Sequence, residues 1–229
     1  MDGVSYKERI VNAIVRGILH LICRLDIQGL EKLPRKGPGF ILSNHTTNIE
    51  GPAVYVFIQP RPATALAKRE LWKHWYTRFF MKTWGVVPVH RGRVDRTALR
   101  AAVRALDSGK YLGIAPEGTR SKTGRLKHAQ PGVALLATMR PAPIYPVAHW
   151  GLLDLGHNLK RLRRTPVSFR VGRPFVVHVD EGRKLSSGDL RAITDEMMRE
   201  LARVLPEELR GAYAETVDEP PRFLEYLDE

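Results

Sequence analysis

Two residues five positions apart carry the first chemical signal in the sequence, a histidine at position 45 and a glutamate at position 50. On a continuous helix this separation turns the second side chain away from the first, and on a strand it points the two to opposite faces. His45 and Glu50 can therefore meet only if the chain turns between them, and Thr46, Thr47 and Asn48 are turn formers. A histidine held by a carboxylate can take a proton from a hydroxyl near neutral pH, so the pair predicts general-base chemistry.

Two later blocks place an arginine at the end of an apolar run. Residues 86–90 are predicted as a strand that ends in Arg91 and a glycine, from which the guanidinium can reach into a cleft. Residues 111–115 are predicted as a strand that ends in Pro116-Glu117-Gly118-Thr119-Arg120-Ser121. Gly118 allows a sharp turn there, and the planar fork of Arg120 suits a phosphate group. A charged surface turn is the simpler alternative for either block.

A fourth block, residues 142–149, is predicted as a strand that contains Pro143 and Pro146. Prolines within a strand are typical of a sheet edge or of a bulge beside a site. We interpret this block as structural.

In this order and spacing, the four blocks resemble the glycerophospholipid acyltransferase family, whose best-known members are 1-acyl-glycerol-3-phosphate acyltransferases. The resemblance runs from Gly29 to Val179, and the Pro-Glu-Gly-Thr-Arg block is its most specific part. The sequence departs from the family at one position, because Glu50 stands where the family usually has aspartate.

The resemblance implies roles for the marked residues. His45 would act as general base on a glycerol hydroxyl, and Glu50 would hold the imidazole and stabilise its charged form. The residues implied in substrate binding are Glu117, Gly118, Thr119 and Arg120, with Arg91 as a second phosphate ligand. Glu117 would either shape its loop or contact the acceptor.

The implied reaction moves a fatty acyl group from acyl-CoA or acyl carrier protein to the free hydroxyl of lysophosphatidate, which forms phosphatidate in phospholipid biosynthesis. Glycerol-3-phosphate, another lysophospholipid and an aminolipid stay open as acceptors. Because of Glu50, a catalytically weak, membrane-docked homologue is a further alternative. No bound cofactor and no metal are expected, since the histidines outside the first block lack ligand spacing.

Strands and helices alternate along most of the chain, which predicts an α/β fold with a mixed, largely parallel sheet covered by helices. We expect a single domain, with an N-terminal amphipathic helix in residues 1–28, an acyltransferase domain in residues 29–180, and a helical, acidic tail in residues 181–229. Within that tail, residues 214–229 are expected to be loosely ordered. The N-terminal helix has apolar residues at helical spacing with basic residues between them, which suits either packing on the core or an anionic lipid surface.

Charge is distributed unevenly along the chain. Residues 1–180 hold 30 lysines and arginines against 11 acidic residues, whereas residues 181–229 hold 7 against 13. A basic body predicts an anionic partner, which can be phosphate groups, a membrane surface or nucleic acid. Nucleic acid is the remote alternative, because recognised binding signatures are missing and His45 would have no role. Since no apolar segment is long enough to span a bilayer and the single cysteine fits a reducing compartment, we expect a cytoplasmic protein that lies on the cytosolic face of the membrane.

Overall fold

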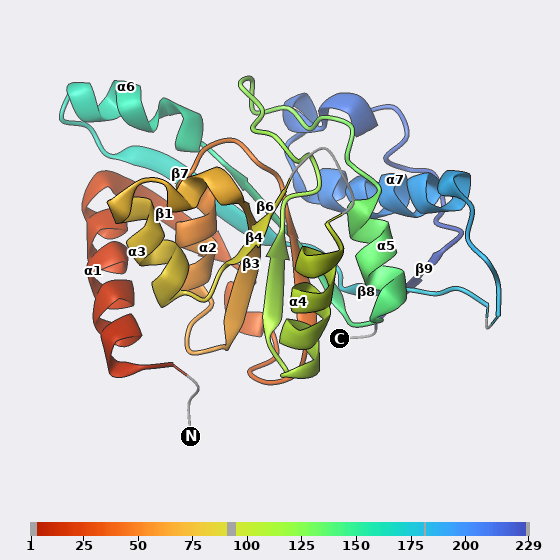
Figure 1. Cartoon of the computed structure of the whole chain (residues 1–229). Coiled ribbons are helices and arrows are strands. Elements are labelled where there is room, and N and C mark those ends of the chain that lie inside the picture. Colours follow the sequence, from red (N-terminus) through yellow and green to blue (C-terminus); the bar gives the residue numbers. More distant parts are fainter. Residues whose placement is uncertain (1–3, 91–94, 181, 228–229) are drawn as a thin grey trace.

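The computed structural model describes residues 4–90, 95–180 and 182–227 of the 229-residue chain (Figure 1). Helices of more than one turn in these residues are α1 (Tyr6–Ile22), α2 (Glu50–Phe57), α3 (Trp75–Thr83), α4 (Arg96–Asp107), α5 (Gly132–Met139), α6 (Leu155–Lys160) and α7 (Ser187–Val204). The strands are β1 (Cys23–Gln28), β2 (Gly39–Ser43), β3 (Ala63–Lys68), β4 (Val87–Val89), β5 (Tyr111–Ile114), β6 (Ile144–Trp150), β7 (Thr165–Val171), β8 (Phe175–Val177) and β9 (Leu224–Tyr226).

The strands of the described residues form one sheet in the order β1-β7-β6-β2-β5-β3-β4, with β8 and β9 added beside β6. Five of the strand pairs are parallel, and the antiparallel pairs are β6 with β7, β6 with β8, and β8 with β9. The predicted α/β domain with a mixed, largely parallel sheet behind an N-terminal amphipathic helix is confirmed.

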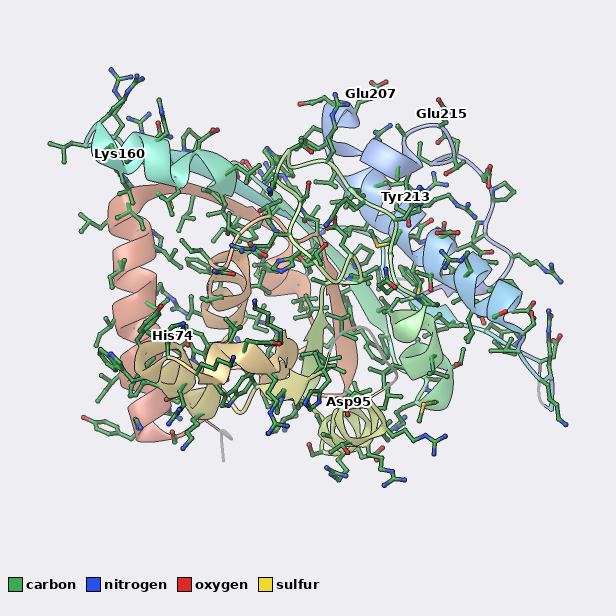
Figure 2. The ribbon with its side chains drawn as sticks, turned by 45° about the horizontal axis from the view of Figure 1, so that its top comes forward. His74, Asp95, Lys160, Glu207, Tyr213 and Glu215 are labelled. Atoms are coloured by element: carbon green, nitrogen blue, oxygen red, sulfur yellow. The ribbon has the colours of Figure 1, made fainter. Side chains whose placement is uncertain are left out.

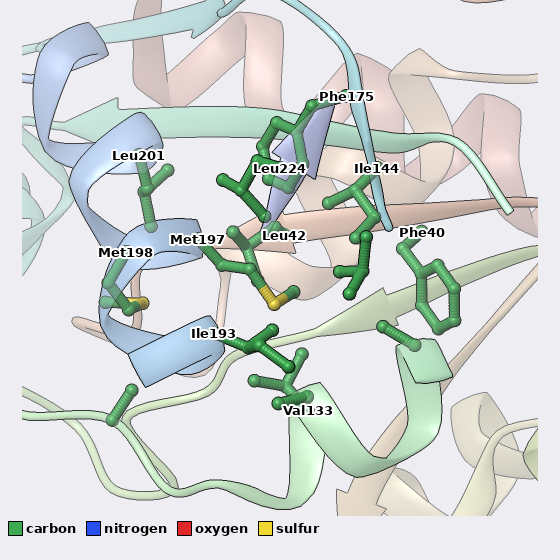
Figure 3. Packing of buried hydrophobic residues seen from close by; sticks show 14 of the residues in the cluster. Phe40, Leu42, Val133, Ile144, Phe175, Ile193, Met197, Met198, Leu201 and Leu224 are labelled. Carbon is green, nitrogen blue, oxygen red and sulfur yellow. The ribbon is translucent and has the colours of Figure 1, made fainter. Parts of the chain in front are cut away.

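Helices cover both faces of the sheet, and the side chains of β2 show how the two cores divide. Phe40 and Leu42 point to the face covered by α4, α5 and α7, where the buried cluster of Figure 3 lies. Ile41 points to the opposite face, where α1 and α2 pack. Successive strand residues alternate between faces, so the continuous apolar run of β2 is what a strand buried on both sides requires.

The parallel strands β2, β5 and β6 bring their carboxyl ends to one edge of the sheet. The chain leaves β2 through α2 over one face, and it passes from β5 to β6 through α5 over the other. A point where the connections diverge in this way is where α/β sheets bind ligands. The segments that follow these strands therefore meet at this edge, and they include His45, Glu117 and Arg120.

Of the two positions expected for the proline-containing strand, a sheet edge or a bulge beside a site, the sheet edge is wrong. β6 lies inside the sheet between β2 and β7. Its antiparallel partner is β8 at Ile144 and β7 from Val147 onward, so Pro146 falls where one partner gives way to the other. A residue without a backbone N–H is tolerated there because neither antiparallel ladder uses it.

Three boundaries differ from the sequence predictions. The first helix ends at Ile22, and the chain continues directly into β1, which pairs with β7 and was not predicted. The second helix, which the sequence predicts for residues 53–58, begins at Glu50. The expectation of a loosely ordered end is wrong for β9, which pairs with β8. None of the described helices is long and apolar enough to cross a bilayer.

Candidate active site

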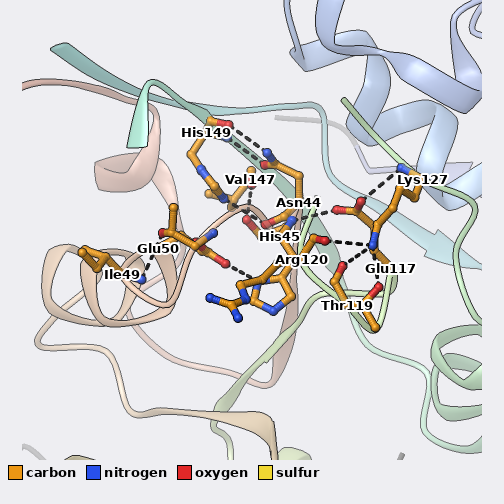
Figure 4. Close-up of polar contacts among 12 residues, drawn as sticks. Asn44, His45, Ile49, Glu50, Glu117, Thr119, Arg120, Lys127, Val147 and His149 are labelled. Atoms are coloured by element: carbon orange, nitrogen blue, oxygen red, sulfur yellow. Dashed lines mark hydrogen bonds and ion pairs between the residues drawn. The ribbon is translucent and has the colours of Figure 1, made fainter. Parts of the chain in front are cut away.

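The turn between β2 and α2 brings His45 and Glu50 into contact. Glu50 is the first residue of α2, and its Oε1 lies against His45 Nδ1 (Figure 4). Its other oxygen accepts hydrogen bonds from the backbone N–H and the hydroxyl of Thr47, both at 2.7 Å. Both carboxylate oxygens of Glu50 are therefore engaged, and the turn is closed by the same side chain that holds the imidazole.

The environment of Glu50 keeps its carboxylate ionised. Burial alone would raise the pKa of Glu50, since the residue is only 5% exposed, but the hydrogen bonds from His45 and Thr47 and the electrostatic interactions with His149 and His45 together lower the pKa. An ionised carboxylate at Nδ1 fixes the proton on that nitrogen and leaves the Nε2 lone pair of His45 as the base. Among the described residues no side chain or backbone group is hydrogen-bonded to Nε2.

A second carboxylate supports the backbone of the histidine. Glu117 is 3% exposed, and its oxygens accept from the backbone N–H groups of His45 at 2.7 Å and Lys127 at 3.1 Å. Burial raises the pKa of Glu117, although these two hydrogen bonds oppose the shift. The side chain of Glu117 therefore links the turn after β2 to the loop after β5.

The loop that follows Glu117 lies directly beside His45. Gly118 has φ +68°, the left-handed conformation that its sharp turn needs, and Ser121 N donates to His45 O at 2.7 Å. Lys127 Nζ donates to the backbone oxygens of Thr119 (2.6 Å) and Arg120 (3.1 Å). The ammonium of Lys127 thus stabilises the loop, while the side chain of Arg120 stays exposed and extends in the same direction as the His45 ring (Figure 4).

A residue that the sequence did not mark as functional lies behind the site. His149, on β6, is fully buried and joined to Asn44 by three hydrogen bonds: Asn44 Nδ2 to His149 O (2.8 Å), His149 N to Asn44 Oδ1 (3.0 Å), and His149 Nε2 to Asn44 O (2.9 Å). Burial lowers the pKa of His149, so the ring is neutral and Nε2 carries the proton. Asn44 precedes His45, so this pair fixes the backbone from which the histidine projects.

The family that the residues resemble can now be compared directly. A family model described as acyltransferase matches residues 24–150, which is more than half of the chain and includes the whole of this site. The chain belongs to the acyltransferase family.

Several curated relatives and one solved structure are similar to this acyltransferase chain. It is 29% identical over 135 residues to a 1-acyl-sn-glycerol-3-phosphate acyltransferase of Bacillus subtilis, covering 58% of the chain and 66% of the relative. It is 31% identical over 134 residues to the protein of that name from Pseudomonas aeruginosa, covering 55% of the chain and 49% of the relative. The matches thus span from about half to about two thirds of these relatives.

The fold is similar to that of a crystal structure titled as the 1-acyl-sn-glycerophosphate acyltransferase of Thermotoga maritima. The TM-score is 0.62 at 24% identity, over 82% of this chain and 75% of that one. At this identity the likeness concerns the fold alone.

The structure places most of the predicted site residues of this acyltransferase chain together. His45, Glu50, Glu117, Gly118, Thr119 and Arg120 all lie at the carboxyl edge of β2 and β5. Arg91 lies outside the described residues, so its predicted role in phosphate binding stays a prediction. Among the described residues no group of three or more histidine, cysteine or acidic side chains could hold a metal ion.

Sequence reasoning missed two parts of this arrangement. Asn44 is a turn former by residue type, and its sequence position does not indicate that it pairs with His149, which lies 105 positions away. Lys127 is one of several cations that follow Arg120 in the sequence, whereas the structure uses its ammonium to hold the loop backbone. For the Asn44–His149 pair, the available signal was a histidine within an apolar strand. For the role of Lys127, the sequence held no signal.

Proposed function

We propose that this protein transfers a fatty acyl group from a thioester to the free hydroxyl of lysophosphatidate. The observation that carries the proposal is the His45–Glu50 pair, held at the carboxyl edge of the sheet and tied through Ser121 to the loop that presents Arg120. The names of the curated relatives support this choice of acceptor. The product would be phosphatidate, a step of phospholipid biosynthesis.

The proposed mechanism needs no covalent intermediate on the protein. Nε2 of His45 removes the proton from the acceptor hydroxyl as the hydroxyl oxygen attacks the thioester carbonyl. The carbon–sulfur bond then breaks, and the imidazolium returns the proton to the leaving thiolate. Glu50 stabilises the imidazolium during this cycle because its carboxylate is ionised and lies against Nδ1.

The acceptor's phosphate would bind to the loop after β5. Arg120 is exposed beside the histidine, and its planar guanidinium can donate two parallel hydrogen bonds to a phosphate. Gly118 lets the loop backbone approach a ligand, and Thr119 is an exposed hydroxyl in the same loop. Glu117 supports the loop by accepting a hydrogen bond from the backbone N–H of Lys127. Arg91 is proposed as a second phosphate ligand.

We further propose that the protein lies on the cytosolic face of a membrane. Exposed apolar side chains line up on α1 and continue onto α3; we call this set the docking face. It consists of Tyr6 (80% exposed), Ile10 (45%), Ile14 (57%), Ile18 (50%) and Leu21 (74%) of α1, with Trp75 (81%), Tyr76 (51%) and Phe79 (40%) of α3. Lys7 stacks its ammonium 4.9 Å from the centre of the Phe79 ring, which joins the two helices. Apolar and aromatic side chains interleaved with cations are typical of interfacial helices.

The test is an assay of purified protein with lysophosphatidate and either acyl-CoA or acyl carrier protein thioester, with the product identified by mass. Glycerol-3-phosphate, other lysophospholipids and aminolipids form the panel of competing acceptors. We expect phosphatidate from wild type and none from His45→Ala. His178→Ala is the matched control, because His178 is exposed and follows β8, which pairs with β6 at Ile144, the end of that strand away from this site. Normal turnover by a folded His45→Ala protein would exclude the mechanism. Faster acylation of another acceptor in the panel would exclude lysophosphatidate as the preferred acceptor.

A further inference from the structure

The connection from α6 to β7 ends in an apolar side chain that is almost fully exposed. Leu162 is 97% exposed, the highest value among the large hydrophobic residues that the structure describes. Its φ is +53°, and among the described residues it is the one non-glycine residue with a positive φ. A leucine in this conformation is strained, and its side chain gains nothing from water.

The shape of this connection explains the strain. Arg161 N and Arg163 N both donate to Asn158 O, at 3.0 and 2.9 Å, and Leu162 N donates to Leu159 O at 3.0 Å. These bonds close the end of α6 around a residue in the left-handed region. Helix ends of this kind usually place glycine or asparagine there. Leucine at this position costs the folded protein stability and contributes no packing in return.

Cations surround the exposed leucine. We call residues 159–164 the α6 tip; its exposed cations are Lys160, Arg161, Arg163 and Arg164. Arg164 has a different role, since its guanidinium donates to His20 O at 2.8 Å and Cys23 O at 2.7 Å. These bonds fasten the tip to the end of α1, where the docking face finishes at Leu21. Figure 2 shows Lys160 at the end of the molecule where α1 ends.

We propose that the α6 tip is a second membrane contact, which inserts Leu162 into an anionic phospholipid leaflet while Lys160, Arg161 and Arg163 meet the headgroups. This inference rests on the membrane part of the proposed function and extends it to a segment distant in sequence from α1. Three observations favour a lipid leaflet over an acidic protein. The side chain of Leu162 projects from the surface instead of lining a groove. Cations flank it on both sides in the sequence. The tip is bonded to the end of α1, where the docking face finishes.

Leu162→Asn separates membrane contact from structure. Asparagine tolerates a positive φ, so this variant should melt at the same temperature as wild type or higher, whereas its loss of the apolar side chain should weaken binding to vesicles. We expect about a tenfold weaker partition of the full-length protein onto phosphatidylcholine vesicles that contain phosphatidylglycerol. Co-sedimentation of protein and vesicles measures the partition.

The charge contribution is tested by a pair of double variants. Lys160→Ala with Arg161→Ala removes two cations from the α6 tip, and Lys184→Ala with Arg191→Ala removes the same two residue types near the start of α7, at the other end of the molecule (Figure 1). Since one cation near an anionic surface changes partition about fivefold, the tip variant should lose at least about tenfold and the control much less.

Equal vesicle binding by Leu162→Asn and wild type would overturn the inference, and so would an equal loss in the two double variants. Unchanged vesicle binding together with lost binding to an acidic carrier protein would identify the tip as a protein contact. These outcomes are independent of the proposed acyl transfer, which stands or falls on phosphatidate formation by wild type and His45→Ala.

Discussion

Glu50 shows how a longer acid can replace aspartate at the start of a helix. One oxygen holds His45 while the other accepts two hydrogen bonds from Thr47 at 2.7 Å. The additional methylene lets the carboxylate, placed at the first residue of α2, reach back across the turn to both partners. The turn is therefore built around glutamate, which argues against an impaired active site.

From this geometry we predict that Glu50→Asp lowers kcat, because the shorter side chain cannot keep both contacts. Glu50→Gln should lower kcat by about a hundredfold or more, since the amide preserves the shape but not the charge that stabilises the imidazolium. Steady-state kinetics on folded variants measures both. A large gain in rate for Glu50→Asp would instead support the alternative of a weak homologue.

The exposed guanidinium of Arg120 makes a second prediction at this scale. Arg120→Ala should raise KM for the phosphorylated acceptor by at least about tenfold, because a charge-assisted bidentate contact is lost, and it should leave KM for the acyl donor unchanged. Arg125→Ala is the matched control, since Arg125 is an exposed arginine of the same loop. An unchanged acceptor KM in Arg120→Ala would exclude the phosphate-binding role.

The buried His149 makes a prediction about stability and pH. Its pKa is depressed by burial below the usual 6.5, so the unfolded chain binds a proton more readily than the folded protein does. The stability that neutral His149 contributes is therefore complete above about pH 6.5 and falls as the pH drops below that value.

His149→Gln should remove this part of the pH dependence. The amide nitrogen of glutamine can replace Nε2 as the donor to Asn44 O, and it does not titrate. Urea unfolding at about pH 8 and about pH 5.5 measures the difference. An identical pH dependence in wild type and variant would show that His149 does not titrate in this range.

At the level of elements, the last strand is the one most at odds with expectation. Phe223 and Leu224 are buried in the core under α7, at 3% and 9% exposed, and Phe223 N donates to Glu196 Oε2 at 2.8 Å. The acidic end of the chain therefore adds β9 to the sheet beside β8 and contributes two side chains to this core.

Phe223→Ala should lower the free energy of unfolding by about 3 kcal/mol, the usual effect of emptying a buried phenylalanine site. Glu225→Ala is the matched control two residues further along, within β9; its side chain is 68% exposed, so the change should stay within about 0.5 kcal/mol. Chemical denaturation measures both. An equal effect of the two substitutions would mean that β9 does not stabilise the core.

The elements predicted well from sequence share strong patterning. β2, β5 and α5 each have a dense apolar run bounded by turn residues. The sequence predicts them at residues 40–43, 111–115 and 132–139, which agree with the structure to within a residue. β1 was missed because it follows α1 without a break, so one helical pattern seemed to cover both. β9 has only three residues, too few to show an alternation.

The predictability of the site divides in a similar way. The contact of His45 with Glu50 was predictable because the two residues lie within one turn. The pairing of Asn44 with His149 was not, since it depends on β6 lying next to β2, and neighbouring strands cannot be paired from residue types alone.

For the whole molecule, the balance of charge governs approach to a surface. The sequence carries a net charge of +13, although its last 49 residues are acidic. Such a protein is attracted to an anionic surface over about 10 Å at 0.1 M salt, and less at higher salt.

We predict that binding to vesicles with phosphatidylglycerol weakens steeply as salt rises, then levels off where the apolar docking face alone holds the protein. Binding to phosphatidylcholine vesicles should change little over the same range. Co-sedimentation across a salt series measures both, and a salt-independent curve for anionic vesicles would contradict an electrostatic approach.

The contacts that hold His45 come from separate stretches of the chain, with Glu117 lying 72 positions away and the Asn44–His149 pair spanning 105. The base is therefore held in place only where β2, β5 and β6 have paired, and a fragment that lacks one of these strands loses contacts that hold His45. Enzymatic activity thus serves as a reporter of complete folding. As urea is raised, activity should disappear together with the secondary structure, in one cooperative transition.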